Sequence, residues 1–218
     1  MEDKLAPLEE TPLMEDKLTY LGHASLKITT RESKTIYIDP YAGDDNDYKT
    51  PADLILVTHD HFDHNEILKV KNRTAETIII TWKEALKDGV YQSFDLGFIK
   101  IQAVPAGYNK FHNEKECVGF ILTLTSGIKI YVPGDTAITP AMDDLKDQNI
   151  DYCFLPMDGI YTMTPETAMG AAEKIKAKQF IPYHTDPNSP EINHQIVDRF
   201  TAKNKLILEQ GEELILKK

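Results

Sequence analysis

The 218-residue chain carries 35 Asp and Glu against 24 Lys and Arg, a formal net charge of −11, and 41% of its residues are hydrophobic. This length and composition predict one globular domain with a sizeable core, and no apolar run approaches the ~20 residues that span a bilayer. The lack of such a run disfavours a membrane role. Phosphate backbones are bound by clustered Lys and Arg, and the sequence has no such cluster, so a nucleic-acid role is disfavoured as well.

The start of the chain contains the same five residues twice. MEDKL occupies positions 1–5 and again 14–18, separated by a segment without clear periodicity. We therefore expect residues 1–16 to be a flexible N-terminal extension and residues 17–218 to form the folded domain. The charged first residues lack the apolar core of a signal peptide, which favours a cytoplasmic location.

Short segments rich in apolar and β-branched residues dominate the first half of the domain, as is typical of strands. The continuous apolar run at 53–58 indicates a strand buried on both faces. Helices are predicted near 66–70 and at 82–87, the second one ended by Gly89. Strands are expected at 18–21, 26–29, 35–38, 53–58 and 77–81.

The second half alternates further strands with helices. Ser126-Gly127 is typical of a hairpin turn. Thr164 is a suitable N-cap for a helix over 164–177, because Pro165 fits the first helical turn, and a second helix is predicted over 190–203. Strands are expected at 98–104, 118–125, 128–132, 152–155 and 179–183, with shorter ones near 207 and at 214–216. This pattern predicts a layered α/β domain.

The clearest functional signal directly follows the apolar run at 53–58. Residues 59–64 are HDHFDH, which places three of the chain's seven histidines and two aspartates within six residues. Sites in α/β folds lie at strand ends, and a divalent cation favours imidazole and carboxylate ligands. His59 and His61 have the period-two spacing that points side chains the same way in an extended segment, so they can share one metal. Asp63 and His64 could reach a second metal.

A series of short blocks accompanies this HxHxDH motif. They are LGHAS at 21–25, IDP at 38–40, VPA at 104–106, VPGDT at 132–136 and IPYH at 181–184. In this order, the blocks resemble the metallo-β-lactamase superfamily, and within it the branch that contains ascorbate-6-phosphate lactonase and N-acyl-phosphatidylethanolamine phospholipase D. The resemblance extends over nearly everything from Leu18 onward. It implies an α/β fold, a four-layer αβ/βα sandwich with two metals in a cleft at one edge.

The resemblance also implies roles for residues outside the motif. Asp135 would bridge the two metals, although Gly-Asp-Thr by itself also suits a turn. His184 would bind the second metal with Asp63 and His64, the alternative being a core or capping histidine. The expected cofactor is one or two Zn²⁺ ions, and Mn²⁺ or Fe is compatible with the same ligands.

One loop departs from the family pattern. The family's first metal takes a third histidine from the loop after the VPA block, but residues 107–112 are GYNKFH and no histidine follows Ala106 directly. Either His112 or Asn109 takes this place, or the place is empty. His112 is then a metal ligand, an outer neighbour of the metal or an exposed loop histidine, and one bound metal instead of two is an open alternative.

Three further residues each have two interpretations. His23 faces the cleft beside the ligands or substrate, or it is a buried histidine that holds backbone groups. Asp158 enters the cleft, or it makes a turn before Gly159. Tyr108 is an oxyanion donor or a packed loop aromatic.

The predicted function is a metal-dependent hydrolase that directs a metal-bound hydroxide at a small ester, lactone or phosphorylated metabolite. Asp63 would orient the nucleophile, and His23, Asp60 or bound water would protonate the leaving group. The expected partner is a small-molecule substrate, with no nucleic acid and no membrane. The alternative is a metal-binding or regulatory protein of the same fold with little or no catalysis, which the altered loop at 107–112 favours.

Overall fold

The structure is a computed structural model that describes residues 14–218. Residues 1–13, which include the first MEDKL copy and most of the predicted extension, lie outside the described residues. The second copy enters the fold, because β1 begins at Lys17 and Leu18 is fully buried in the core.

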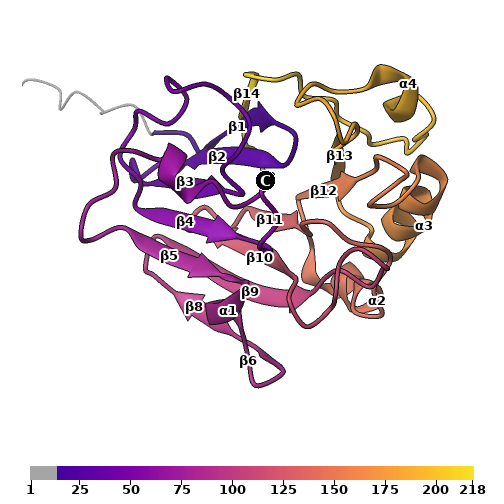
Figure 1. Ribbon diagram of the computed structural model, residues 1–218, viewed down its shortest axis with the longest axis horizontal. Coiled ribbons are helices and arrows are strands. Elements are labelled where there is room, and N and C mark those ends of the chain that lie inside the picture. Colours follow the sequence, from indigo (N-terminus) through magenta and orange to yellow (C-terminus); the bar gives the residue numbers. More distant parts are fainter. Residues whose placement is uncertain (1–13) are drawn as a thin grey trace, which may run out of the picture.

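Two six-stranded sheets face each other (Figure 1). The first sheet consists of β1 (Lys17–Gly22), β2 (Ser25–Thr29), β3 (Thr35–Ile38), β4 (Leu54–Val57), β5 (Ile78–Thr81) and β14 (Glu213–Ile215), in the order β14-β1-β2-β3-β4-β5. The second consists of β8 (Ser93–Asp95), β9 (Ile99–Pro105), β10 (Val118–Leu124), β11 (Lys129–Val132), β12 (Tyr152–Pro156) and β13 (Gln179–Tyr183), in the order β13-β12-β11-β10-β9-β8. Each sheet has one parallel part, β3-β4-β5 in the first and β11-β12-β13 in the second.

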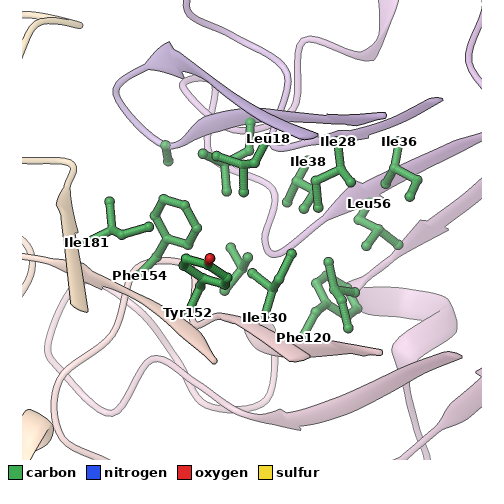
Figure 2. Packing of buried hydrophobic residues seen from close by; sticks show 14 of the residues in the cluster. Leu18, Ile28, Ile36, Ile38, Leu56, Phe120, Ile130, Tyr152, Phe154 and Ile181 are labelled. Carbon is green, nitrogen blue, oxygen red and sulfur yellow. The ribbon is translucent and has the colours of Figure 1, made fainter. Parts of the chain in front are cut away.

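The main hydrophobic core fills the space between the sheets. Figure 2 shows Leu56 of β4 and its sheet neighbours pointing toward Phe120 and Phe154 of the opposite sheet. β4 is buried on both faces, since Leu54 and Leu56 belong to this core while the alternate side chains pack into a separate outer cluster. Burial on both faces explains why the run at 53–58 is continuously apolar.

The outer faces of the sheets are covered in different ways. α3 (Pro165–Ile175) and α2 (Met142–Leu145) pack on the second sheet through a cluster that includes Tyr131 and Leu155. The first sheet is covered by irregular chain, with Tyr48 and Val70 packed against it. The predicted α/β sandwich is therefore confirmed, and its helical layer is well developed over the second sheet.

α3 begins and ends as its sequence predicts. The side chain of Thr164 accepts a hydrogen bond from the Thr167 amide at 3.2 Å, and Pro165 occupies the first turn. Lys176 at the C-cap has a left-handed conformation with a φ of 56°. The remaining short elements are η1 (Ile67–Lys69), α1 (Trp82–Ala85), β6 (Leu86–Lys87), β7 (Val90–Tyr91), η2 (Lys146–Gln148) and α4 (His194–Val197).

Three predicted helices are shorter than expected. The one near 66–70 is a single turn, η1, and the one at 82–87 ends at Ala85 because Leu86–Lys87 pair with Val90–Tyr91 in a hairpin. The prediction of a helix over 190–203 is wrong beyond α4. Just after this segment, the Phe180 amide donates a hydrogen bond to the Asn204 carbonyl, and the Leu206 amide donates one to the Phe180 carbonyl. This pairing requires an extended chain at residues 204–206. None of the helices between residues 14 and 218 is long and apolar enough to cross a membrane.

Candidate metal centre

The polar segments identified from the sequence meet at one edge of the two sheets. Parallel strands deliver several of them, because the C-terminal ends of such strands share one edge of a sheet. HDHFDH follows β4, Asp135 follows β11, His184 follows β13, His112 lies between β9 and β10, and His23 lies between β1 and β2.

Three histidines form the first group. The Nδ1 atom of His61 lies 3.1 Å from Nε2 of His59 and 3.1 Å from Nε2 of His112, so three ring nitrogens face one point. Tetrahedral Zn–N bonds of 2.0–2.1 Å place ligand atoms about 3.3 Å apart, so the spacing suits a metal ion. His112 supplies the third nitrogen of this group, and Oδ1 of Asn109 lies behind it, 3.2 Å from Nδ1 of His112.

Asp63, His64 and His184 form a second group, with His23 beside them, and their candidate ligand atoms all lie within 4.8 Å of one another. Asp135 lies between the two groups. Its Oδ2 atom is 3.3 Å from Nε2 of His112 and 3.2 Å from Nε2 of His184. A single carboxylate therefore faces both groups of histidines.

Three buried atoms that face this centre have no hydrogen-bond partner among the described residues, namely Nε2 of His64, Nε2 of His184 and Oδ1 of Asp135. The same holds behind the centre for Nδ1 of His184 and Oδ2 of Asp158. Buried polar atoms in proteins are nearly always bonded. The orphaned state and the convergence of the three atoms that face the centre indicate that the residues fit a bound divalent cation.

Four of the histidines are held from behind through Nδ1, which leaves Nε2 free to face the centre. The pairs are His59 with Thr58 Oγ1 at 3.0 Å, His64 with Asp39 Oδ2 at 2.8 Å, His112 with Asn109 Oδ1 at 3.2 Å, and His184 with Asp158 Oδ2 at 3.0 Å. The outer partners of the first group are uncharged, whereas those of the second group are carboxylates.

Burial and neighbouring charges divide the histidines into two kinds. Burial lowers the pKa of His61 and holds that of His59 well below its usual range, so both are neutral near pH 7, as metal binding requires. Burial opposes protonation of His184 as well, but the Asp135 carboxylate outweighs it and raises the pKa of His184 to about 9. Asp135 is also buried, yet His184 and His64 hold its pKa well below its usual range.

His23 holds backbone groups, which is one of its two predicted interpretations, and it is not among the residues that line the cavity described below. It is buried, its amide donates to Pro190 O at 2.8 Å, and its carbonyl accepts from the His184 amide at 2.9 Å. Its Nε2 atom also lies 3.2 Å from Oδ2 of Asp63. Burial would raise the pKa of Asp63, but this contact lowers it below its usual range.

Asp60, the other carboxylate of the motif, does not join the centre. It is exposed, accepts a hydrogen bond from the Asn65 side chain and forms an ion pair with Lys83 at 2.8 Å. The two carboxylates of the motif therefore point in different directions, and only that of Asp63 faces the histidines.

Asp158 makes the turn before Gly159, which is one of its two predicted interpretations, and it is not among the residues that line the cavity described below. Its Oδ1 atom accepts hydrogen bonds from the amides of Ile160 and Tyr161, at 2.6 and 2.7 Å, so it builds the turn. Its Oδ2 atom faces His184. Tyr108 is exposed and is not among the residues that line the cavity described below.

The role of Asp39 was not foreseen from the sequence. This fully buried carboxylate accepts hydrogen bonds from the Thr58 amide at 2.8 Å and from the Thr58 hydroxyl at 2.7 Å, and it faces His64. Its only sequence signal is the Ile38-Asp39-Pro40 block at the end of an apolar strand.

A cavity of about 420 Å³ opens over the centre. Asp63, Asp135 and His184 are among its polar lining residues, and Phe62 and Tyr161 are among its apolar ones. A small molecule that enters this cavity meets both groups of candidate ligands.

Comparison with known proteins identifies relatives along most of the chain. A family model described as a beta-lactamase superfamily domain matches residues 17–184. A UPF0173 metal-dependent hydrolase from Geobacillus sp. (strain WCH70) is 31% identical over 226 residues, covering 92% of this chain and all of the relative. One from Anoxybacillus flavithermus is 34% identical over 227 residues, with the same coverage.

Solved structures agree with these matches. The crystal structure assigned to a metal-dependent hydrolase from Parabacteroides distasonis is 28% identical, has a TM-score of 0.73, and covers 90% of this chain and 94% of its own. Igni18, a metallo hydrolase from Ignicoccus hospitalis, is 21% identical with a TM-score of 0.73 and covers 93% and 98% of the two chains. At that identity, the second likeness shows the fold alone.

Proposed function

This chain belongs to the beta-lactamase superfamily domain family and, like its UPF0173 relatives, is a metal-dependent hydrolase; from this premise we propose that it cleaves a small ester, lactone or phosphorylated metabolite at a two-metal centre. The first metal would be held by His59, His61 and His112, and the second by Asp63, His64 and His184. Zinc is the metal we propose, because imidazole and carboxylate are its usual ligands.

The observation that carries the proposal is the position of Asp135. Its carboxylate is within 3.3 Å of a ring nitrogen from each group, so we propose that it bridges the two metals. The order of the sequence blocks further supports placing the chain near the branch with ascorbate-6-phosphate lactonase and N-acyl-phosphatidylethanolamine phospholipase D.

When bound, divalent cations at these positions would activate water as a nucleophile and polarise the oxygen of the substrate. Asp63 lines the cavity and stays ionised, because its pKa lies below its usual range. It can therefore accept a hydrogen bond from the attacking water and orient it. His23 positions Asp63 from behind and can share a proton with it at 3.2 Å.

The alternative of a binding or regulatory protein rested on the altered loop at 107–112. With His112 facing His61 at 3.1 Å, the loop supplies a third imidazole to the first group. This supports the catalytic proposal over the non-catalytic one.

The motif itself offers a matched pair of variants for testing the centre. We expect Asp63→Asn to lose most of the metal bound in the second group and to reduce turnover by at least about a hundredfold, since a ligand and the water-orienting group are removed together. Asp60→Asn, the control, removes an exposed carboxylate of the same motif and should retain both. His61→Ala should abolish turnover while the fold persists.

Metal content by plasma mass spectrometry and turnover of ester, lactone and phosphoester substrates would be measured on the same zinc-loaded samples. Full metal occupancy with no turnover of any substrate would count against the hydrolase. Equal behaviour of Asp63→Asn and Asp60→Asn would count against the assigned centre.

A further inference from the structure

Three exposed aromatic residues gather at the cavity over the metal centre. Phe62, Phe111 and Tyr161, here called the aromatic wall, are 74%, 39% and 42% exposed, and all three line the cavity. Single exposed apolar side chains are common on proteins, but a group of them in a concave site indicates a binding surface.

The aromatic wall is built by the same residues that orient the candidate ligands. Asn109 accepts hydrogen bonds from the amides of Phe111 and His112, both at 2.9 Å, and its side-chain amide donates to the Tyr161 carbonyl at 3.1 Å. Asp158 binds the Tyr161 amide with one oxygen and faces His184 with the other.

Two of the three rings, those of Phe111 and Tyr161, pack against each other, whereas the Phe62 ring contacts Tyr41. The ring centroids of Phe111 and Tyr161 are 4.8 Å apart with the planes at 67°, an edge-to-face arrangement. The aromatic wall is therefore held in a defined position beside His112 and His184, although it is exposed.

The charges of the cavity argue against an anionic substrate. No Lys or Arg is among the described residues that line it. Lys110 lies over the Phe111 ring, 4.5 Å from its centroid, and is not a lining residue. A phosphate monoester is usually held by Arg or Lys forks in addition to any metal.

Negative side chains surround the second group of candidate ligands. The second group and its surroundings contain four carboxylates, those of Asp39, Asp63, Asp135 and Asp158. Ionised together, they would balance the charge of two divalent cations.

We propose that the aromatic wall binds the apolar alkyl or aryl group of an uncharged ester or lactone and thereby sets substrate specificity. This inference rests on the proposed hydrolase function. Water oxygen bonds to the carbonyl carbon, the acyl–oxygen bond breaks, and the departing oxygen takes a proton, giving an acid and an alcohol. A cavity of about 420 Å³ limits the substrate to a small molecule.

A series of esters that differ only in acyl length tests the proposal. Zinc-loaded protein would be assayed with p-nitrophenyl acetate, butyrate and hexanoate, and with p-nitrophenyl phosphate and its bis-ester. We expect kcat/KM to rise by about tenfold from acetate to hexanoate, which is less than full burial of four methylenes would give, and to be lowest for the phosphate monoester.

Phe111→Ala and Tyr161→Ala should remove this dependence on chain length by raising KM for hexanoate more than KM for acetate. Leu68→Ala is the matched surface control, because Leu68 is 80% exposed and does not line the cavity. The Leu68→Ala variant should show the same rise of kcat/KM from acetate to hexanoate as the unmodified protein. Equal kcat/KM values for acetate and hexanoate, or a preference for the phosphate monoester, would overturn the proposal and leave the hydrolase function standing.

A binding experiment covers the case in which no substrate is turned over. Calorimetric titration of the zinc-loaded protein with acetohydroxamate and hexanohydroxamate compares two ligands with the same metal-binding group and the same charge but different tails. Tighter binding of the longer tail, lost in Phe111→Ala, would support the aromatic wall even if the hydrolase function failed. Identical affinities, or a tail preference that Phe111→Ala and Tyr161→Ala both retain, would contradict it.

Discussion

Asp39, which lies behind the candidate ligand His64, shows how single residues outside the ligand set determine the geometry of the centre. It occupies a left-handed backbone conformation with a φ of 46°, and the neighbouring His23 and His184 do the same at 52° and 45°. Such conformations are costly for residues other than glycine and persist only where surrounding contacts hold them. Backbone hydrogen bonds do so here, since His184 donates to His23 and Asp39 donates to Leu56.

Replacing the outer carboxylate should therefore weaken the centre without touching a candidate ligand. For Asp39→Asn, we expect zinc affinity to fall about 10- to 100-fold, because His64 loses the charged partner that orients it. Competition with a chromophoric chelator measures the affinity, and circular dichroism checks the fold. The control is Asp45→Asn, an exposed carboxylate paired with Lys71. Unchanged zinc affinity in Asp39→Asn would exclude the orienting role.

At the scale of elements, α3 and the segment at 190–203 show when local signals succeed. α3 has an N-cap, a proline in its first turn and a buried alanine-rich face, and all three favour the same helix. The segment at 190–203 has helical spacing of apolar residues, with Val197 and Phe200 both buried. Its helix ends early, and residues 204–206 are extended, because Asn204 and Leu206 form backbone hydrogen bonds with Phe180 of β13.

The capping of α3 gives a prediction at this scale. Thr164→Ala should lower the free energy of unfolding by about 1 kcal/mol, because the Thr167 amide loses its partner at the helix start. Urea denaturation measures the change, and Thr164→Ser, which keeps the hydroxyl, should recover most of it. A loss as large in Thr164→Ser as in Thr164→Ala would show that the cap is not responsible.

At the scale of the whole molecule, stability depends on the core between the two sheets. Both sheets bring their buried faces to this core (Figure 2). Each sheet also carries part of the candidate centre at one edge. The packing that stabilises the fold thus holds the two groups of candidate ligands at a constant distance. This explains how side chains from separate sheets can share Asp135.

Removing a large side chain from this core should be costly. Leu122 is fully buried in β10, and we expect Leu122→Ala to destabilise the protein by about 2–5 kcal/mol through lost burial and a residual cavity. Leu68→Ala makes the same chemical change at an exposed site and should cost less than about 0.5 kcal/mol. Denaturation in the presence of a chelator keeps bound metal from masking the difference. Similar losses in both variants would argue against this core as the source of stability.

The sequence by itself determined most of the strands, the start of α3, the class of fold and the presence of a histidine and aspartate cluster after β4. It missed β6, β7 and β8, and the strand predicted near 207 is not formed. The features that it determined are local, because strand burial, helix capping and the HDHFDH spacing each depend on residues close together in the chain. Asp135 and His184 were assigned through ordered motif blocks that resemble a known family, and the structure brings both to the cluster.

Only the tertiary structure brought His112 to face His61 with Asn109 behind it, gave Asp39 and Asp158 their positions behind His64 and His184, and assembled the aromatic wall. Each of these depends on side chains that are distant in the sequence and meet only when the two sheets pack. Loop conformation was the decisive factor for His112, since the turn made by Asn109 determines which side chain faces His61. No periodicity in the sequence encodes such a meeting, because its geometry is set by the packing of the whole core.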